Sequence, residues 1–179
     1  IPKKNRIRRC KVKQIPVKAD IETQEIFKTN ILEPLVEQAK AEKIEIFFVD
    51  AAHFVMQPFL GYLYSLTVRF IKVSSGRQRF SVLGALNAVT KEVVNITDHG
   101  YINALSVCAL LQKLYDQRRH LPQVVIMDNA RYQRCALVAE KALELGIQIV
   151  FLPPYSPNFN LIERLWKFVK KKALYNQYY

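Results

Sequence analysis

The chain has 179 residues, half of them hydrophobic, which suits one globular domain with a sizeable core and argues against disorder. The 27 Lys and Arg residues outnumber the 15 Asp and Glu residues and give a net charge of +12, which favours a polyanionic partner. The longest apolar stretch, 54–68, contains a glutamine, a proline and a glycine, so it is no membrane span, and the sequence shows no signal peptide. Its three cysteines, at positions 10, 108 and 135, have neither a pairing pattern nor metal-ligand spacing, which indicates a reducing compartment.

A basic arm, residues 1–20, opens the chain. It has no acidic residue before Asp20, lacks hydrophobic periodicity and holds two prolines, so we expect an extended linker or arm. Such a block is typical of a solvated tail or of a segment that lies on phosphate groups, and composition alone favours neither. Eight of the twelve excess positive charges lie here, on Lys3, Lys4, Arg6, Arg8, Arg9, Lys11, Lys13 and Lys18.

The next part of the chain predicts a helical segment followed by strands. Residues 21–43 have apolar side chains at helical spacing, broken at Pro34, which indicates one interrupted helix or two short ones. Residues 44–50 are typical of a buried central strand. Residues 62–73 and 80–87 alternate like strands joined by a turn at 74–76, and residues 91–96 allow a further short strand. Strands that follow one another this closely favour antiparallel pairing.

The second half of the chain alternates helices with strands. Apolar stripes predict helices over 103–119 and over 133–145, the latter stopped by Gly146, and buried strands over 124–128 and 147–152. Three prolines predict a stiff loop over 153–157, and an amphipathic pattern predicts a final helix carrying Lys167, Lys170, Lys171 and Lys172. The order βββ-α-β-α-β-α predicts an α/β fold, with a mixed sheet and helices on both of its faces.

Three acidic residues stand out by their positions. Asp50 and Asp128 each end a predicted buried strand, and the carboxyl edge of an open α/β sheet is a common ligand site. Glu163 opens the final helix, after the 34 residues 129–162. If the two strands are neighbours, the carboxylates form a set of hard oxygen ligands, which suits Mg²⁺ or Mn²⁺ and a phosphate-bearing substrate.

Each acid also has a purely structural interpretation. An aspartate that follows a strand can cap the next turn, as the pair Asp128-Asn129 could do. The segment from Asn160 to Glu163 has the spacing of a capping box, in which the glutamate serves the first amides of the helix. Glu163 also stands one helical turn before Lys167, so an ion pair within the helix is a third interpretation. Position alone leaves these alternatives open.

Other candidate residues carry less specific signals. His53 has no histidine or cysteine nearby to complete a zinc site, so a loop histidine near phosphate or one packed against the sheet is favoured. Asn129 fits a turn or the positioning of a water or ligand. Motifs for acyl transfer, ATP hydrolysis and dinucleotide binding are absent from the sequence. The aromatic residues available for base stacking are Tyr132, Tyr155, Phe159 and Trp166, and the core spacing of Trp166 favours packing instead.

The motifs around the three acids form a specific set. They are F-V-D-A-A-H-F around Asp50, D-N-A-R from Asp128, and F-L-P-P-Y-S-P-N-F-N-L-I-E-R-L-W around Glu163. Together they resemble the motifs of DDE transposases of the mariner-type superfamily, particularly its bacterial insertion-sequence members. The gap of 34 residues is that of the branch whose third acid is glutamate. The resemblance runs from near Ala19 to about Lys172.

The resemblance implies an RNase H-like catalytic domain over 44–179, behind the linker 1–20 and a helical lead-in over 21–43. Its expected sheet has five strands, three antiparallel and then two parallel. Asp50, Asp128 and Glu163 are then the catalytic residues, which hold two Mg²⁺ ions, with Mn²⁺ as a substitute. The implied reaction cleaves transposon-end DNA and joins the 3′-hydroxyl end to target DNA, with TA dinucleotides as the expected target.

The resemblance also implies partners and a location. We expect double-stranded DNA as the partner, a homodimer assembled on it, no membrane, and the nucleoid of a bacterial or archaeal cytoplasm. A nuclease of the same fold and a catalytically inactive DNA-binding remnant are the alternatives. The residues expected to contact DNA are Lys3, Lys4, Arg6, Arg8, Arg9, Lys11, Lys13, Arg77, Arg79, Lys167, Lys170 and Lys171.

The sequence departs from the family pattern in three places. Ala51 and Ala52 stand where members often carry an acid after the first aspartate, and Leu161 stands where a proline commonly precedes the Ile-Glu pair. Members also carry N-terminal helix-turn-helix modules, for which the residues before Ile21 are too few. We therefore expect a catalytic-domain fragment, a second reading frame normally joined by frameshifting, or a degenerate copy.

Overall fold

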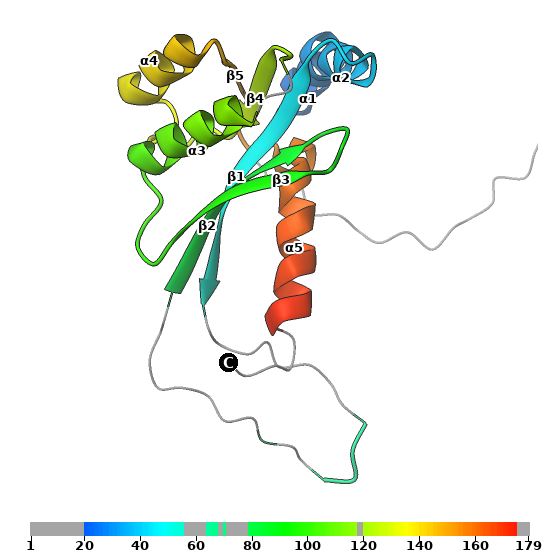
Figure 1. Cartoon of the computed structure of the whole chain (residues 1–179). Coiled ribbons are helices and arrows are strands. Elements are labelled where there is room, and N and C mark those ends of the chain that lie inside the picture. The colour runs from blue at the N-terminus through cyan, green and yellow to red at the C-terminus, as the bar shows by residue number, and fades with distance from the viewer. Residues whose placement is uncertain (1–19, 56–63, 68–69, 71–78, 118–119, 175–179) are drawn as a thin grey trace, which may run out of the picture.

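A five-stranded sheet in the order β3-β2-β1-β4-β5 forms the centre of the protein (Figure 1). The structure is a computed structural model that describes residues 20–55, 64–67, 70, 79–117 and 120–174. The strands β1 (Glu45–Val55), β2 (Arg79–Asn87) and β3 (Val93–Asp98) pair antiparallel. Strand β4 (Gln123–Met127) runs parallel to β1, and β5 (Gln148–Phe151) runs parallel to β4. The predicted mixed sheet, with three antiparallel strands and then two parallel ones, is confirmed.

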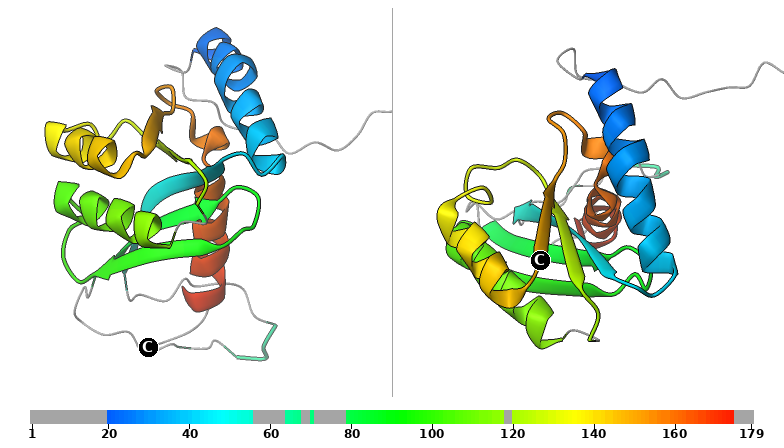
Figure 2. Two further views of the ribbon diagram at one scale, coloured as in Figure 1. Left: turned by 45° about the horizontal axis from the view of Figure 1, so that its top comes forward. Right: turned by 90° about the horizontal axis from the view of Figure 1, so that it is seen from above.

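Helices cover both faces of the sheet (Figure 2). Successive side chains of a strand point to opposite faces, and β1 shows this clearly. Phe47 and Val49 belong to the core that packs under α3 (Ala104–Asp116) and α4 (Ala136–Leu145). Ile46 and Phe48 belong to the core on the other face, which α2 (Glu33–Lys40) and α5 (Leu161–Leu174) cover. Because both faces are buried, the central strands read as nearly continuous apolar runs.

One helical rod leads into the sheet, and it contains a widened turn. It consists of α1 (Ile21–Phe27), the π-helical turn η1 (Lys28–Leu32) and α2. The Glu33 amide donates to the Lys28 carbonyl, five residues back instead of four. Pro34 at the start of α2 has no amide hydrogen and its ring crowds the preceding turn, which explains why the helix widens there without ending. Of the two predicted alternatives, the interrupted single helix is observed.

The strand predicted over 62–73 is wrong at its described residues, 64–67 and 70, which lie in no strand. Its other residues and the turn predicted at 74–76 lie outside the described residues. The place assigned to it is taken by β1, which continues five residues past Asp50 and pairs Phe54 with Phe80 of β2. The third antiparallel strand is β3, close to the short strand expected over 91–96.

The helices of the second half follow their local signals. Helix α3 begins after Asn103, which exchanges capping-box hydrogen bonds with Ser106. Helix α4 begins at Ala136, three residues later than predicted, because Cys135 is extended and residues 131–134 form a turn. It ends at Gly146 in the left-handed conformation, as predicted. Within the described residues, no helix is long and apolar enough to cross a membrane.

Candidate active site

The three predicted acids line one cavity. Asp50 comes from β1, Asp128 from the residue that follows β4, and Glu163 from the first turn of α5. The cavity has a volume of about 410 Å³, and its remaining wall is formed by Asn129, Ala130, Leu152, Pro153, Pro154, Tyr155, Ser156 and Asn160. Residues 113 positions apart in the sequence therefore share one site, as the hypothesis of a three-acid site requires.

The register between β1 and β4 places the two aspartates. Phe48 pairs with Ile126 in the parallel ladder, and two residues further along the same register stand Asp50 and Asp128. The prediction that these strands are neighbours is confirmed. The prediction that Asp50 ends its strand is wrong, because β1 continues to Val55 alongside β2. The opening beside Asp50 arises from the end of β4 at Met127, which leaves β1 without a neighbour on that side.

A close contact between α5 and the sheet places Glu163. Asp50 shares a face of β1 with Ile46 and Phe48, the face that α5 covers. Its partner across the β1–β2 ladder is Gly84, and a Cβ atom there would lie 2.6 Å from Cζ2 of Trp166 and 3.1 Å from Cδ1 of Ile162. The missing side chain lets α5 approach the sheet closely, and its first turn then faces Asp50.

The start of α5 is anchored to β1 by Asn160. The Nδ2 atom of this buried residue donates to the Val49 carbonyl at 3.4 Å, directly before Asp50. The Glu163 amide donates to the Asn160 backbone carbonyl at 3.3 Å, so the predicted capping box is wrong. The reason is that the Asn160 side chain points to the sheet and not to the helix amides.

Within the part of the chain that the structure describes, the Glu163 carboxylate has one cationic partner. Its Oε2 atom lies 3.4 Å from Nζ of Lys167, as the ion-pair alternative predicted. The lysine side chain is 78% exposed, and an exposed pair of this kind contributes only about 0.3–0.5 kcal/mol in a helix. Such a weak pair leaves the carboxylate free to bind a ligand in the cavity.

Backbone anchors hold the proline loop as the opposite wall. The Asn129 side-chain amide donates to the Leu152 carbonyl, and the Leu152 amide donates to the Met127 carbonyl at 2.9 Å. The Ser156 hydroxyl donates to the Pro154 carbonyl at 3.3 Å. Asn129 therefore joins the end of β4 to this loop. Asp128 also accepts a hydrogen bond from the Ala130 amide at 3.3 Å, so its predicted turn role coexists with its place in the cavity.

The site concentrates negative charge. Burial is the main cause that raises the pKa of Asp50 to about 7, and the charges of Asp128 and Glu163 contribute to the rise, while the hydrogen bond from the Ala51 amide and the charge of Lys170 oppose it. None of the described residues that line the cavity is basic. Among the residues described, no three acidic, histidine or cysteine side chains converge closely enough to hold one ion together. The three carboxylates thus surround the cavity without meeting at a point.

His53 lies outside this cavity. It is exposed on β1 and its Nδ1 atom shares a hydrogen bond of 2.9 Å with the Ser81 hydroxyl, which in turn donates to the Gly100 carbonyl. His53 therefore lies in a strand and not in a loop, and its exposed ring contacts the neighbouring strand through Ser81. Burial lowers the pKa of His53, and the charges of Arg79 and Lys170 lower it further.

The four aromatic candidates for base stacking differ in how free their rings are. Trp166 is buried, as predicted, and meets the Phe54 ring edge to face at 6.2 Å. Phe159 stacks on Phe27 at 6.3 Å. Tyr132 is half-buried beside the core under α3 and α4, and burial raises its pKa to about 12. Tyr155 alone of the four is exposed, and it lines the cavity.

Part of the predicted basic surface lies beside the site. Lys167, Lys170 and Lys171 are spaced so that they share one side of α5. Nζ of Lys170 lies 5.6 Å above the Phe54 ring of β1, and the Arg79 guanidinium lies 5.1 Å above the Tyr101 ring. The basic candidates over 3–13 and at 77 lie outside the described residues.

A family model described as DDE superfamily endonuclease matches residues 45–179. The chain belongs to this family. The DDE match begins at the first residue of β1 and includes all three acids. No curated protein matches the sequence.

Solved structures share the fold of this DDE family member. The Mos1 mariner paired-end complex with Mn has a TM-score of 0.65 at 15% identity, over 98% of this chain and 56% of that chain. The Mos1 transposase paired-end complex with the left transposon end has a TM-score of 0.64 at 16% identity, over 98% and 55%. A chain of the simian T-cell lymphotropic virus intasome has a TM-score of 0.51 at 15% identity, over 72% and 38%. The RNase H-like fold is thereby confirmed, and the DDE chain spans little more than half the length of its Mos1 matches.

Two residues that position the three acids have no such role in the sequence-based prediction. The sequence pattern puts Gly84 in a strand without indicating a role, and it favours Asn160 as the helix cap. The sequence offers a signal for the first, because an isolated glycine inside a strand often marks a close approach by another element. It offers none for the bond from Asn160 to Val49, which joins residues 111 positions apart.

Proposed function

We propose that this chain is the catalytic core of a DNA transposase, which cleaves transposon-end DNA and joins the resulting 3′-hydroxyl end to target DNA by metal-dependent phosphoryl transfer. The observation that carries the proposal is the meeting of three carboxylates, from β1, the end of β4 and the start of α5, on one cavity without a basic residue among its described lining. Membership of the DDE family supports the same assignment.

The residues present fit divalent metal ions. Among the described residues that line the cavity, every charged group is a carboxylate, and burial together with the charges of Asp128 and Glu163 raises the pKa of Asp50. Mg²⁺ commonly binds through one or two carboxylates together with waters and substrate phosphates, so three acids spread around a cavity suit two ions better than one. When bound by Asp50, Asp128 and Glu163, Mg²⁺ or Mn²⁺ supplies Lewis-acid activation of the attacking hydroxyl and of the leaving oxygen.

The protein's own contribution is to fix these three groups. Gly84 and Asn160 set the distance of α5 from β1, and Asn129 holds the proline loop against the end of β4. The reaction needs no protein nucleophile, because water or a DNA hydroxyl attacks the phosphorus in both steps.

Basic residues around the cavity would receive the DNA backbone. Lys167, Lys170 and Lys171 on α5 and Arg79 on β2 are the described candidates, and the arm and Arg77 add to them. The Mos1 structures that share this fold are paired-end complexes, one of them with a left transposon end, and this supports double-stranded transposon ends as partners and assembly as a homodimer on DNA. A TA target and a place in the bacterial or archaeal nucleoid belong to the same proposal.

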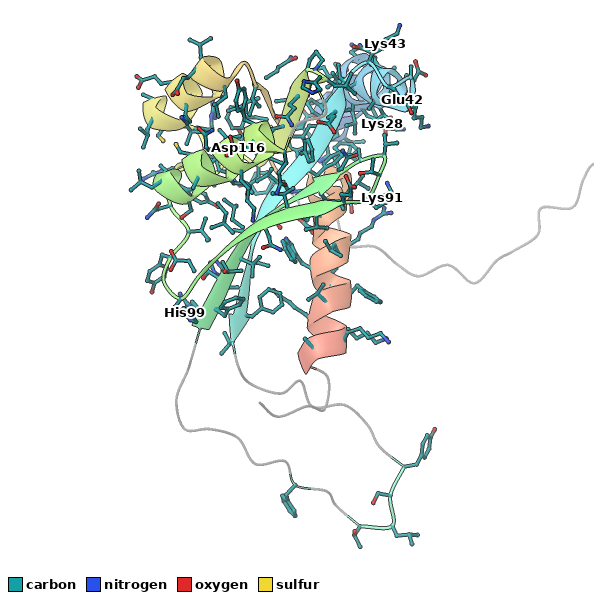
Figure 3. All side chains as sticks on the ribbon, viewed as in Figure 1. Lys28, Glu42, Lys43, Lys91, His99 and Asp116 are labelled. Atoms are coloured by element: carbon teal, nitrogen blue, oxygen red, sulfur yellow. The ribbon has the colours of Figure 1, made fainter. Side chains whose placement is uncertain are left out.

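The proposal is tested by strand transfer in vitro. Purified protein is incubated with Mn²⁺ or Mg²⁺, a labelled pre-cleaved transposon-end duplex and a target plasmid. We expect joined product with the wild-type chain, none in EDTA and at least a hundredfold less with Asp128→Ala or Glu163→Gln. The matched control is Asp116→Asn, because Asp116 is an acid at the end of α3 and outside the cavity (Figure 3), and its product yield should equal that of wild type.

The two alternatives to a transposase give different results in this assay. Nicked plasmid without joined product, lost in the same two variants, would replace the transposase by a nuclease of the same fold. Binding that weakens steeply with salt, without any product in either metal, would leave a catalytically inactive DNA-binding remnant.

A further inference from the structure

Tyr155 is an aromatic residue that the fold leaves free at the mouth of the acid-lined cavity. Tyr155 is 51% exposed, although it is one of the residues that line the same cavity as the three acids. The other aromatic candidates of the same region are engaged, Phe159 with Phe27 and Trp166 with Phe54. Among the described residues, the Tyr155 ring has no aromatic or cationic partner.

The backbone at Tyr155 adopts a conformation that tyrosine rarely takes. Its φ of +58° lies in the left-handed region, which bulky side chains disfavour and glycine accepts without strain. Residues held this way occur where the surrounding structure forces them, often at ligand sites. The turn between Pro154 and Ser156 requires this backbone conformation, and glycine would adopt it with less strain than tyrosine. The fold alone therefore does not explain why a tyrosine stands here.

The segment that carries Tyr155 is anchored on both sides. Nε2 of Gln24, on α1, donates to the Tyr155 carbonyl at 3.2 Å, across 131 residues of sequence. The neighbouring Ser156 is buried and bonds to the Pro154 carbonyl. Because the backbone is fixed at these points, the ring loses little conformational entropy when a flat ligand stacks on it. This low entropic cost is one reason why aromatic side chains are common in binding sites.

We propose that Tyr155 is a base-stacking residue, whose ring receives the nucleobase next to the phosphate that the acid-lined cavity holds. The inference rests on the proposed function, because a phosphate in that cavity places its flanking base near the cavity mouth. Stacking is tolerant of base identity, since every base has a flat face, so Tyr155 would position the strand without reading its sequence. Tyr155 is thus a positioning residue, and its loss should weaken binding of the strand more than it slows the chemical step.

The test is a fluorescence measurement that requires no catalysis. A short duplex with single-stranded overhangs carries 2-aminopurine at successive positions near one end, and protein is added at low salt with Ca²⁺, a hard divalent ion that carboxylates bind and that can stand between them and a phosphate. We expect strong quenching at one or two adjacent positions with wild type and with Tyr155→Trp or Tyr155→Phe. Tyr155→Leu and Tyr155→Gly should lose the quenching and bind the overhang about tenfold more weakly. The control is Phe168→Ala, another exposed aromatic residue, on α5 and outside the cavity wall, which should behave as wild type.

The glycine variant separates binding from folding. Because glycine relieves the left-handed strain, Tyr155→Gly should have a Tm equal to or above that of wild type while it loses the signal. Quenching and affinity that are unchanged in Tyr155→Gly overturn the inference, and so does equal quenching at all positions. If the protein joins DNA but the quenching does not depend on Tyr155, this inference is wrong and the proposed function stands. If the quenching depends on Tyr155 but the protein neither nicks nor joins DNA, the proposed function is wrong and the stacking role of Tyr155 stands.

Discussion

Asp50 is held in an environment that opposes its ionisation. Its side chain is half-buried between α5 and the end of β4, and two further carboxylates face the same cavity. These surroundings raise its pKa from an ordinary value of 3.8 to about 7. A raised carboxyl pKa means that the folded protein holds a proton that the unfolded chain has already lost. The ionised site is therefore a source of instability that a bound cation would remove.

In the absence of metal, the free energy of unfolding of the protein should fall as the pH rises. Below pH 4 both states are protonated at this position, and Asp50 contributes no pH dependence. Between pH 4 and pH 7 the folded state binds more protons, so the free energy of unfolding falls as pH rises, by up to about 1.4 kcal/mol per pH unit. Above pH 7 Asp50 is ionised in both states, and the resulting loss in the free energy of unfolding reaches its full value, at most on the order of 4 kcal/mol. Asp50→Asn should remove this slope and be the more stable protein at pH 8.

Urea unfolding in EDTA at pH 5 and pH 8 measures this difference. Adding Mg²⁺ at pH 8 should stabilise the wild-type protein and have a smaller effect on Asp50→Asn, because a ligand that binds only the folded state shifts its stability. Equal stability of the two proteins at pH 8 would mean that Asp50 is not destabilising when ionised.

The sequence predicts the three acids but not all of their surroundings. Asp50 and Asp128 follow apolar runs, and two such runs in one α/β chain form parallel neighbours by simple topology. The direction of the Asn160 side chain depends on a carbonyl of β1, which no local pattern reveals. The role of Glu163 is ambiguous in the sequence for the same reason. Its capping and ion-pair alternatives involve residues in or directly before one helix, whereas the cavity is formed by residues far apart in the sequence.

At the scale of the element, the docking of α5 on the sheet sets the geometry of the site. The Trp166 and Ile162 side chains occupy the space that a side chain at position 84 would need. Gly84→Ala should therefore push α5 outwards, destabilise the protein by about 1–3 kcal/mol through overpacking, and move Glu163 away from Asp50. Chemical denaturation and the strand-transfer assay should both register the change.

A second substitution identifies the cause of that effect. Trp166→Phe removes the ring atoms closest to Gly84, so Gly84→Ala should cost less in its presence than in wild type. Gly100→Ala is the matched control, because a Cβ there meets only the Asp98 carboxylate at 3.4 Å, an ordinary contact. Additive effects of the changes at 84 and 166 would contradict the proposed overpacking.

Helix α4 offers a prediction that follows from local signals alone. Gly146 ends the helix with a φ of +67°, and nothing within 4 Å would obstruct a methyl group there. Gly146→Ala should thus destabilise the protein by about 1 kcal/mol from backbone strain, without steric conflict or loss of the acid site. A thermal unfolding curve with wild-type Tm would contradict this.

The sequence predicts an element well where neighbouring residues determine it, and poorly where distant residues do. The helix boundaries at Asn103 and Gly146 were close because caps are local, whereas α4 began late because the turn before it resembles a first helical turn in sequence. The alternation over 62–73 suggested a strand, yet period-two alternation does not say which segment pairs with which. In the fold, β2 pairs with the extension of β1 instead. Pairing partners are a tertiary property.

At the scale of the molecule, the net charge is unevenly distributed. Of the +12 total, +8 belongs to residues 1–19, and the remaining 160 residues carry +4. The described basic residues near the cavity are few, so a large part of non-specific affinity for DNA should come from the arm. The sequence alone left open whether this arm is a solvated tail or a phosphate-binding segment, and salt dependence distinguishes the two.

Each cation that neutralises a phosphate of B-DNA contributes about 0.9 to the slope of the logarithm of the binding constant against the logarithm of salt concentration. If the arm lies on phosphates, removal of residues 1–19 should lower that slope by several units, up to about 7, and weaken binding at low salt. Replacing the eight basic residues by glutamine should give the same slope at unchanged chain length, because charge and not length is responsible. Fluorescence anisotropy over a range of KCl concentrations measures both variants, and slopes equal to that of the full chain would identify the arm as a solvated tail. Unfolding of the shortened chain in urea should match that of the full chain, because α1 is already capped by Asp20, whose Oδ1 accepts from the Thr23 amide at 3.2 Å.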